Sequence, residues 1–493
     1  MYTIGIDIGT TGTKTYVLDG KGAVCGQGYQ AYGLDFRSGG YVGQNPEDWW
    51  NACVVSVRQA ISGIRDKEVI CAMALSTQGG SSFIADAYGR PLMDAMTWMD
   101  ARALDQIKGL QETFSDEFFY NKTGWKLNVS MDVTKYLWLR QHKKELIKKG
   151  NCFVSTLEFI NRKLVGTYVI DPTNAAMRQL INVRTLEWDE EILDYLEIDV
   201  GFLPEIAPSG GYLGTLSRQA AEELGLPAHV RVYNGMHDQY SAAIGAGAVH
   251  KGDLMLSTGT AWVVLGVTNS LMFTNSFIAA GRHALDGLYG ALATLPVAGV
   301  ALDWFKKGFG IDSYEQINEL CRDKKANARN LFFYPYFNGA TFPLWQYDAK
   351  AAMVGLSLEH DRFDVAYALM EGVVFQMKMM LDDYKRNGFE GDRISVMGGA
   401  LKSELWMSLI ASITGCRVNK VKITDTACIG AALVAGVAGG IYGSYESILA
   451  EISPLEAEDV RGESLEYYAE KYDAYQRNWD SLSLVYEGNA VRK

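Results

Sequence analysis

The first residues of the chain alternate between apolar runs and short turns. Tyr2–Asp7 is apolar up to its last residue, Gly9–Gly12 is rich in glycine and threonine, and Lys14–Leu18 is apolar again. An Asp-Gly turn at residues 19–22 then leads into a third run at Ala23–Ala31. Glycine and Asp-Gly at such turns favour tight hairpins. The pattern predicts three antiparallel strands.

The same pattern returns far along the chain. Residues 253–265, DLMLSTGTAWVVL, again predict a strand, a Gly/Thr turn and a strand. Two copies of one supersecondary unit indicate two related halves facing each other. We place the boundary inside GAGAVHKG, which gives a first domain at residues 1–247 and a second at residues 248–493.

The rest of the chain alternates between helical and strand patterns. Asn45 and Pro46 are typical of a helix start, as a cap and as the first helical residue. Alternation of this kind is typical of an α/β fold. The predicted helices are 46–64, 130–148, 217–224, 362–387 and 401–414, and the further predicted strands are 68–75, 81–86, 394–397 and 417–421.

One uncharged stretch, Thr426–Gly443, is long enough to cross a bilayer. It contains five glycines and few large side chains. These features favour a closely packed, buried helix that ends near Gly439 and Gly440 over a membrane span.

Composition narrows the classes of partner. A chain of 493 residues is too long for a single hydrophobic core, which predicts two or more domains. The formal net charge of -12 argues against nucleic acid or an anionic membrane as the main partner. The seven cysteines form no CxxC pair, which indicates reduced thiols. Because the N-terminus enters a strand without a signal peptide, we expect a cytoplasmic protein.

The acid that ends the first strand requires an explanation. A lone charge in an apolar strand is costly unless it is paired or binds a metal, so Asp7 either begins a turn or has a function. The Gly/Thr turn that follows can point backbone N–H groups into a nest for phosphate, with Lys14 adding positive charge. Asp7 could then hold Mg²⁺. The alternative is that GTTGT is only a hairpin turn.

Two further segments point to a nucleotide. The turn Ser257–Thr260 offers a second phosphate nest in the other half, and the small residues Gly398–Ala400 would let a flat ring lie against the backbone. The chain has neither a GxxxxGK[ST] motif nor a complete dinucleotide fingerprint. Together the segments predict a nucleoside triphosphate site of another kind.

Asp238 is the candidate general base. We expect a strand ending at Tyr233, a turn at Asn234-Gly235 and a helix from about Gln239, which places Asp238 near a helix N-terminus between the halves. A carboxylate there could take the proton of a hydroxyl that attacks the γ-phosphate, or it could simply cap the helix. The neighbouring His237 has no second ligand at metal spacing, which favours a packing or hydrogen-bonding role.

These segments, in this order, resemble the FGGY carbohydrate kinases, a branch of the actin-like ATPase superfamily. The similarity rests on GIDIGTTGTK, LSTGTA, GMHDQYSAAIGAG and MGGALKSELWMSLIASITGCRVNKVKITDTACIGAALVAG. It implies an α/β fold with two RNase H-like domains, and ATP, Mg²⁺ and a sugar in the cleft between them. It also implies that Asp238 is the base and Asp7 the Mg²⁺-linked carboxylate. The implied ATP and phosphate neighbours are Thr10, Thr11, Lys14, Gly259, Thr260, Gly299, Gly399, Ala400 and Ser403.

The segment STQGGSSFIADAYGRPLMDAMTWMDAR resembles the sugar-contacting region of the family. Polyol recognition needs convergent donors and acceptors with an aromatic face, which favours Gln78, Trp98, Asp100 and Arg102 as contacts. The alternative for Trp98 is core packing. The chain also departs from xylulokinases: Gly79-Gly80 replace Met-His, and Asn338-GATFP replaces a GERTP loop. Asp425 stands where the family commonly has Glu, so the cap of that helix is expected to differ.

The expected activity is ATP-dependent phosphorylation of a small sugar or polyol, with a ketopentose such as xylulose first. Gluconate or a tetritol or pentitol is the alternative within the kinase class. The alternatives from other classes are an actin- or chaperone-like ATPase and a sugar-binding regulator without turnover. The C-terminal segment SLEYYAEKYDAYQRNWDSL predicts an amphipathic surface or interface helix, which is compatible with a homodimer.

Overall fold

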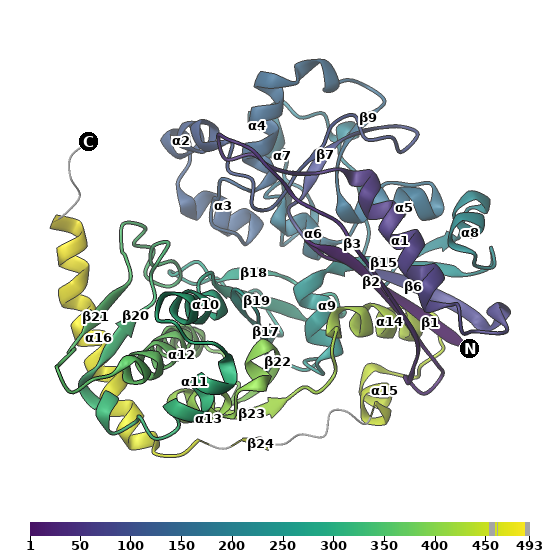
Figure 1. Cartoon of the computed structure of the whole chain (residues 1–493). Helices are drawn as coiled ribbons and strands as arrows, with labels where there is room; N and C mark the ends of the chain where they lie inside the picture. Colours follow the sequence, from purple (N-terminus) through teal and green to yellow (C-terminus); the bar gives the residue numbers. More distant parts are fainter. Residues whose placement is uncertain (453–458, 461, 489–493) are drawn as a thin grey trace.

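The computed structural model describes residues 1–452, 459–460 and 462–488, and Figure 1 shows two α/β halves that meet at the centre of the molecule. The first half contains a six-stranded sheet with the order β14-β15-β6-β1-β2-β3. Strands β1 (Tyr2–Ile8), β2 (Gly12–Leu18) and β3 (Val24–Ala31) form the predicted antiparallel meander. Strand β6 (Ile70–Thr77) is parallel to β1, and β15 (Arg231–His237) is parallel to β6.

The second half repeats this topology in a seven-stranded sheet with the order β18-β19-β17-β16-β22-β23-β24. Strands β16 (Asp253–Thr258) and β17 (Trp262–Thr268) are the second antiparallel hairpin. Strands β22 (Arg393–Gly398) and β23 (Arg417–Lys420) then continue the sheet in parallel from β16. The recurrence of the hairpin pattern in the sequence therefore corresponds to two copies of one sheet arrangement.

The remaining elements surround the two sheets. In the first half they are α1 (Pro46–Ala60), α2 (Leu104–Thr113), α3 (Asp116–Thr123), α4 (Asp132–His142), α5 (Thr156–Val165), α6 (Pro172–Met177), α7 (Glu190–Leu196), α8 (Arg218–Leu224), α9 (Asp238–Gly245), β4 (Asp35–Phe36), β5 (Val42–Gln44), β7 (Ser82–Asp86), β8 (Ala95–Met96), β9 (Asn151–Ser155), β10 (Val169–Ile170), β11 (Ile181–Asn182), β12 (Glu187–Trp188), β13 (Glu205–Ile206) and β14 (Tyr212–Thr215). In the second half they are β18 (Ala279–Arg282), β19 (Tyr289–Leu295), β20 (Phe332–Tyr334), β21 (Ala352–Val354), β24 (Asp459–Val460), α10 (Gly299–Gly308), α11 (Tyr314–Cys321), α12 (Arg362–Arg386), α13 (Glu404–Thr414), α14 (Thr426–Ala438), α15 (Tyr445–Glu451) and α16 (Leu465–Gly488).

The predicted turn at Asn234-Gly235 is wrong, because β15 continues through both residues with a bulge between Tyr233 and Met236. The buried Asn234 side chain accepts a hydrogen bond from Asn161 at 3.0 Å and donates one to the carbonyl of Ala207 at 2.9 Å. A Cβ atom on Gly235 would lie 2.4 Å from the carbonyl oxygen of Leu75. The glycine therefore serves a close approach between strands instead of a turn.

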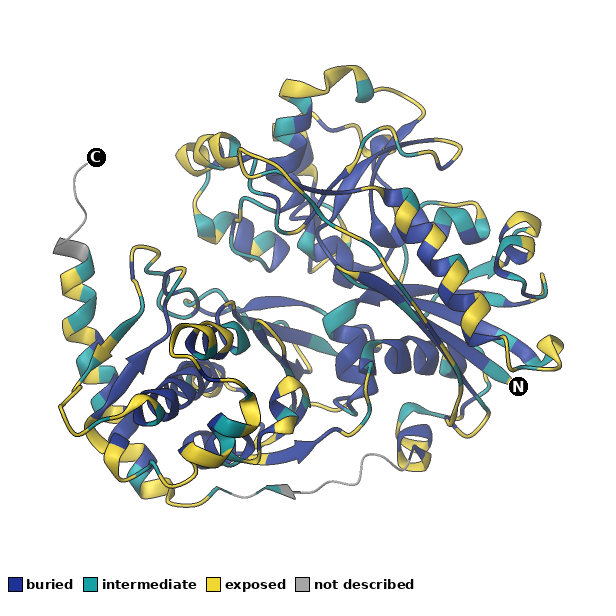
Figure 2. Ribbon diagram, in the orientation of Figure 1, coloured by how far each residue is buried: buried dark blue, intermediate teal, exposed yellow. Residues whose placement is uncertain are grey.

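The uncharged segment forms the buried helix α14, which lies against α9 between the two halves (Figures 1 and 2). A Cβ atom on Gly430 would lie 1.9 Å from the carbonyl oxygen of Ser241, and one on Gly245 would lie 2.0 Å from that of Thr426. The small residues thus allow direct backbone contact between the two helices. Within residues 1–452, 459–460 and 462–488, no helix is both long and apolar enough to span a membrane.

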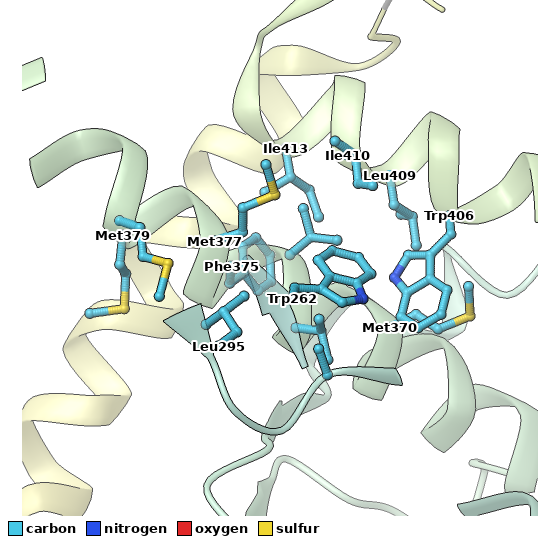
Figure 3. Packing of buried hydrophobic residues seen from close by; sticks show 14 of the residues in the cluster. Trp262, Leu295, Met370, Phe375, Met377, Met379, Trp406, Leu409, Ile410 and Ile413 are labelled. Atoms are coloured by element: carbon cyan, nitrogen blue, oxygen red, sulfur yellow. The ribbon is translucent and has the colours of Figure 1, made fainter. Parts of the chain in front are cut away.

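A large hydrophobic core supports the second hairpin (Figure 3). Trp262 of β17 packs against Trp406 of α13 with ring centroids 5.0 Å apart. The C-terminal helix α16 joins this core, since Tyr475 is buried and stacks on Tyr334 at 4.3 Å. The aromatic face of α16 therefore packs on its own chain while Leu465 and Leu484 stay exposed, which agrees with the predicted amphipathic surface helix. The homodimer remains a prediction.

Candidate active site

A cavity of about 630 Å³, the central cavity, lies between the two halves. It is bounded on one side by residues of the first half and on the other by the turn between β16 and β17. Both Gly/Thr turns therefore face one space, as their recurrence predicts. Its lining includes Thr10, Gln78, Gly79, Gly80, Trp98, His237, Asp238, Gln239, Ser257, Gly259, Thr260 and Thr294.

The two turns present backbone to this space. In the first turn the amide of Gly9 donates to the carbonyl of Gly12 at 3.0 Å, which leaves Thr11 exposed at the tip. In the second turn the amide of Gly259 donates to the carbonyl of Ala261 at 3.1 Å, and Thr260 is exposed. Turns of this kind form concavities of N–H groups that suit phosphate oxygens.

Gly299 supports the second turn from behind. A Cβ atom on Gly299 would lie 2.2 Å from the carbonyl oxygen of Gly259, so only glycine fits. The amide of Val300 also donates to the carbonyl of Thr260 at 3.2 Å. The start of α10 is thus fastened to the turn.

The end of β22 lies beside the same turn, because Gly398 pairs with Thr258 in the sheet. Gly399 is exposed there, while the amide of Ala400 donates to the hydroxyl of Thr258 at 3.0 Å. Ser403 caps α13 by accepting from the amide of Trp406. This edge therefore offers bare backbone of the kind expected beside an adenosine ring.

Asp238 is the first residue of α9 and lines the central cavity. The backbone cap of the helix is His237, and no side chain caps it, so the capping interpretation of Asp238 is wrong. Its Oδ1 atom is buried without a hydrogen-bond partner, although 28% of the side chain is exposed. Burial raises the pKa of the Asp238 carboxyl to about 6. A carboxylate with this pKa suits a general base near neutral pH.

His237 lies directly behind this carboxylate, with Nε2 3.1 Å from Oδ1 of Asp238. Burial lowers the pKa of His237 to about 4, so the ring is neutral near pH 7 and the contact is not an ion pair. The part of the chain that the structure describes contains no group of three His, Cys, Asp or Glu residues that could hold a metal. The hydrogen-bonding or packing role expected for His237 stays a prediction.

Asp7 is the last residue but one of β1 and is paired across the hairpin with Lys14. The hydroxyl of Ser76 donates to Oδ1 of Asp7 at 2.7 Å. Burial, together with the negative charge of Asp238, raises the pKa of Asp7 to about 7. Mg²⁺ is bound in proteins by one or two carboxylates together with phosphate oxygens and water. The carboxylates of Asp7 and Asp238 therefore fit Mg²⁺ beside a polyphosphate.

Lys14 connects the two halves. Its ammonium group forms an ion pair with Asp425, which also accepts a hydrogen bond from the hydroxyl of Tyr16 at 2.8 Å. Asp425 precedes α14 with a φ of 60°, and its side chain makes no capping hydrogen bond. The sequence predicts an altered cap at the start of α14, and in the structure the carboxylate of Asp425 pairs with Lys14 instead of capping the helix. Contact of Lys14 with phosphate stays a prediction.

Trp98 lies at the wall of the central cavity with 45% of its surface exposed, so the core-packing interpretation is wrong. Gln78 lines the same wall. Asp100 and Arg102 do not join them in the lining. Arg102 pairs with Asp100 at 2.6 Å and lies over the ring of Tyr41 at 3.9 Å, which leaves both charges satisfied outside the cavity.

Several lining residues give no recognisable signal in the sequence. Asn128 and Ser130 reach the central cavity from the loop between α3 and α4, and Met177 reaches it from the end of α6. Each is an isolated residue in a segment without periodic pattern. Only the positions of the folded loops bring them together.

Comparison with known proteins places these features in a family. Residues 2–245 match the N-terminal domain of the FGGY family of carbohydrate kinases, and residues 254–439 match its C-terminal domain. A xylulose kinase of Staphylococcus epidermidis is 28% identical over 477 residues, which cover 96% of this chain and 95% of that protein.

Two solved structures from Lactobacillus acidophilus have the same fold. Ligand-bound xylulose kinase and gluconate kinase each align with a TM-score of 0.91 at 24% identity, covering 99% of this chain and 99% of theirs. The predicted pair of actin-like ATPase domains is thereby confirmed.

Proposed function

This chain belongs to the FGGY family of carbohydrate kinases, and we propose that it transfers the γ-phosphoryl group of ATP to a hydroxyl of a neutral sugar, with a ketopentose such as xylulose as the first candidate. The observation that carries this proposal is the unpartnered oxygen of Asp238 in the cavity that both Gly/Thr turns enter. Family membership favours a kinase over an actin- or chaperone-like ATPase and over a regulator without turnover.

In the proposed reaction Asp238 accepts the proton of the attacking hydroxyl. In-line phosphoryl transfer needs little covalent help from the protein, so positioning and charge stabilisation account for most of the acceleration. The Asp238 carboxyl is ionised above its pKa of about 6 and is then ready to accept the proton. Neutral His237 behind it adds no positive charge that would weaken the base.

We assign Mg²⁺ to Asp7, directly or through water, because its carboxylate faces Asp238 and carries a raised pKa. When bound, Mg²⁺ would neutralise phosphate oxygens during transfer. Ser76 holds one oxygen of Asp7 and so fixes the direction of the carboxylate.

We propose that both domains, residues 1–247 and residues 248–493, contribute contacts to ATP. The first turn with Thr10 and Thr11, and the second with Gly259 and Thr260, would hold the phosphates from opposite sides. Gly399 would lie against the adenosine. The same assignment extends to Lys14, Gly299, Ala400 and Ser403 on the nucleotide side and to Gln78 and Trp98 on the sugar side, whereas Asp100 and Arg102 lie outside the cavity lining.

The charge of the cavity supports a neutral substrate over gluconate. Among the described residues that line it there is no Lys or Arg, and His237 is neutral. In the neighbouring space Lys126 pairs with Asp116 at 2.9 Å and lies over the ring of Trp345 at 4.6 Å. A sugar carboxylate would therefore lose its hydration without gaining a counter-charge. A pentitol or tetritol is the second candidate, since its hydroxyls suit the same lining.

We place the reaction in the cytoplasm, where ATP is supplied and where the free cysteines stay reduced. A coupled ADP-release assay with ketopentoses, pentitols, tetritols and gluconate tests the proposal. We expect the highest kcat/KM with a ketopentose and little turnover of gluconate. Preferred turnover of gluconate, or ATP hydrolysis that no sugar stimulates, would overturn it.

A further inference from the structure

Gln78, a residue of the cavity lining, has a buried side-chain acceptor that no group of the protein uses. Gln78 lines the cavity, only 2% of the residue is exposed, and its Oε1 atom has no hydrogen-bond partner in the protein. A buried acceptor without a donor is unfavourable, so native proteins rarely keep one without a use. A ligand in the cavity that Gln78 lines is the available source of a donor for this acceptor.

The direction of the Gln78 amide is set by a second glutamine, Gln44. The Nε2 group of Gln78 donates to Oε1 of Gln44 at 3.0 Å. The oxygen and nitrogen of an amide are distinguished by their partners, so the orientation of Gln78 follows from that of Gln44.

The orientation of Gln44 follows from partners that have no ambiguity. The indole nitrogen of buried Trp49 can only donate, and it lies 3.2 Å from Oε1 of Gln44. The carbonyl oxygens of Thr10 and Gly33 can only accept, and they lie 2.7 Å and 3.2 Å from Nε2 of Gln44. Turning Gln44 over would set donor against donor and acceptor against acceptors.

The same argument extends one residue further. With Oε1 of Gln44 fixed, turning Gln78 over would bring two amide oxygens face to face. The chain Trp49, Gln44, Gln78 thus has one favourable arrangement, and it leaves the oxygen of Gln78 without a partner in the protein.

We propose that Gln44 is a positioning residue that makes Gln78 an obligatory hydrogen-bond acceptor, so that a substrate must donate a hydroxyl hydrogen at this point. This inference rests on the proposed function, because it concerns the sugar of that reaction. A hydroxyl can donate, whereas a carboxylate or keto oxygen at the same place cannot. A substrate that lacks the hydroxyl would leave the oxygen unpaired.

Gln44 also binds the phosphate turn through Thr10, so a loss of rate alone would not reveal its role. The informative quantity is a ratio: kcat/KM for the best sugar divided by kcat/KM for each monodeoxy analogue that keeps the phosphorylated hydroxyl. This ratio is to be measured for the wild type, Gln44→Leu, Gln78→Leu and the double variant. Gln111→Leu is the matched control, since Gln111 is an exposed residue of α2.

In the wild type one analogue should be disfavoured by on the order of 10²–10⁴-fold. Gln78→Leu should bring that ratio close to one. Gln44→Leu should lower it at least about tenfold, because Gln78 can then rotate. The double variant should give the same ratio as Gln78→Leu alone, because Gln44 acts through Gln78, and Gln111→Leu should leave the wild-type ratio unchanged.

Trp49→Phe is the second variant, in case Gln44→Leu does not fold. It removes the indole donor and keeps an aromatic ring, so the ratio should fall, though by less. An unchanged ratio in these variants, with both substrates slowed equally, would overturn the positioning role. Equal use of every deoxy analogue by the wild type would overturn the acceptor role of Gln78. A wild type that phosphorylates no sugar would instead refute the proposed function, and this inference with it.

Discussion

The indole nitrogen of Trp98 lies 3.1 Å from the hydroxyl oxygen of Thr10 and donates a hydrogen bond to it. Trp98 stands in the wall that we assign to the sugar, whereas Thr10 belongs to the turn that we assign to the phosphates. This bond therefore links the two parts of the cavity that the proposed reaction must bring together. The bond predicts that a substitution of Trp98 changes the binding of ATP.

Trp98→Phe tests this link because it keeps an aromatic face and removes the donor. We expect KM for ATP to rise up to about tenfold, the usual effect of one net hydrogen bond, while the fold stays intact. Steady-state kinetics with ATP and sugar varied separately measure it. A change in KM for the sugar alone would contradict the link.

Asp238→Asn should abolish sugar phosphorylation and leave ATP binding intact. The amide cannot accept the proton, so we expect a loss of ~10²–10⁴ in kcat. Calorimetric titration with ATP, alongside the coupled assay, separates the two properties. Asp105→Asn is the control, since this exposed aspartate lies far along the chain in α2. Wild-type turnover by Asp238→Asn would exclude Asp238 as the base.

The activity should depend on pH through the same carboxyl. Because burial raises the pKa of Asp238 to about 6, the ionised base is lost as the pH falls through that value. We expect kcat/KM for the sugar to be level at about pH 7–8 and to fall toward tenfold per unit well below pH 6. A profile measured at saturating MgATP that stays flat down to about pH 4.5 would indicate an unperturbed carboxyl.

Asp7→Asn should stabilise the protein when Mg²⁺ is absent. The pKa of Asp7 is raised from its usual 3.8 to about 7, so this carboxyl favours the fold while protonated and loses that contribution as the pH rises between these values. At about pH 8 with a chelator, the variant should melt a few degrees above the wild type.

Added Mg²⁺ should reverse this order, because it binds the wild-type carboxylate and stabilises the fold by mass action. Thermal melts with Mg²⁺ and with chelator measure both effects. Equal shifts in the two proteins on adding Mg²⁺ would place the ion elsewhere.

Features that depend on local chemistry were accessible from the sequence. The turns at Gly9–Gly12 and Ser257–Thr260 need glycine and threonine at fixed spacing, and Asp238 follows an apolar strand at a helix start. Both turns and Asp238 line one cavity in the structure.

Features that depend on distant partners were not accessible. Asn234 resembles a turn residue until Asn161 and Ala207 satisfy its amide within β15. Gln44 carries no signal in the sequence, and the role that we propose for it depends on its hydrogen bonds with Trp49 and Gln78 in the folded chain. The tyrosines of α16 form a pattern that suits a dimer or a core equally, and β20 decides between them.

The contact of α9 with α14 has a mechanical meaning. Asp238 begins α9, and Gly245 ends it with its backbone pressed against Thr426. The proposed base therefore stands on the first residue of a short helix whose last residue is in direct backbone contact with α14. A methyl group added to Gly430 would meet the carbonyl oxygen of Ser241, three residues after Asp238, so a substitution on α14 would displace the helix on which the proposed base stands.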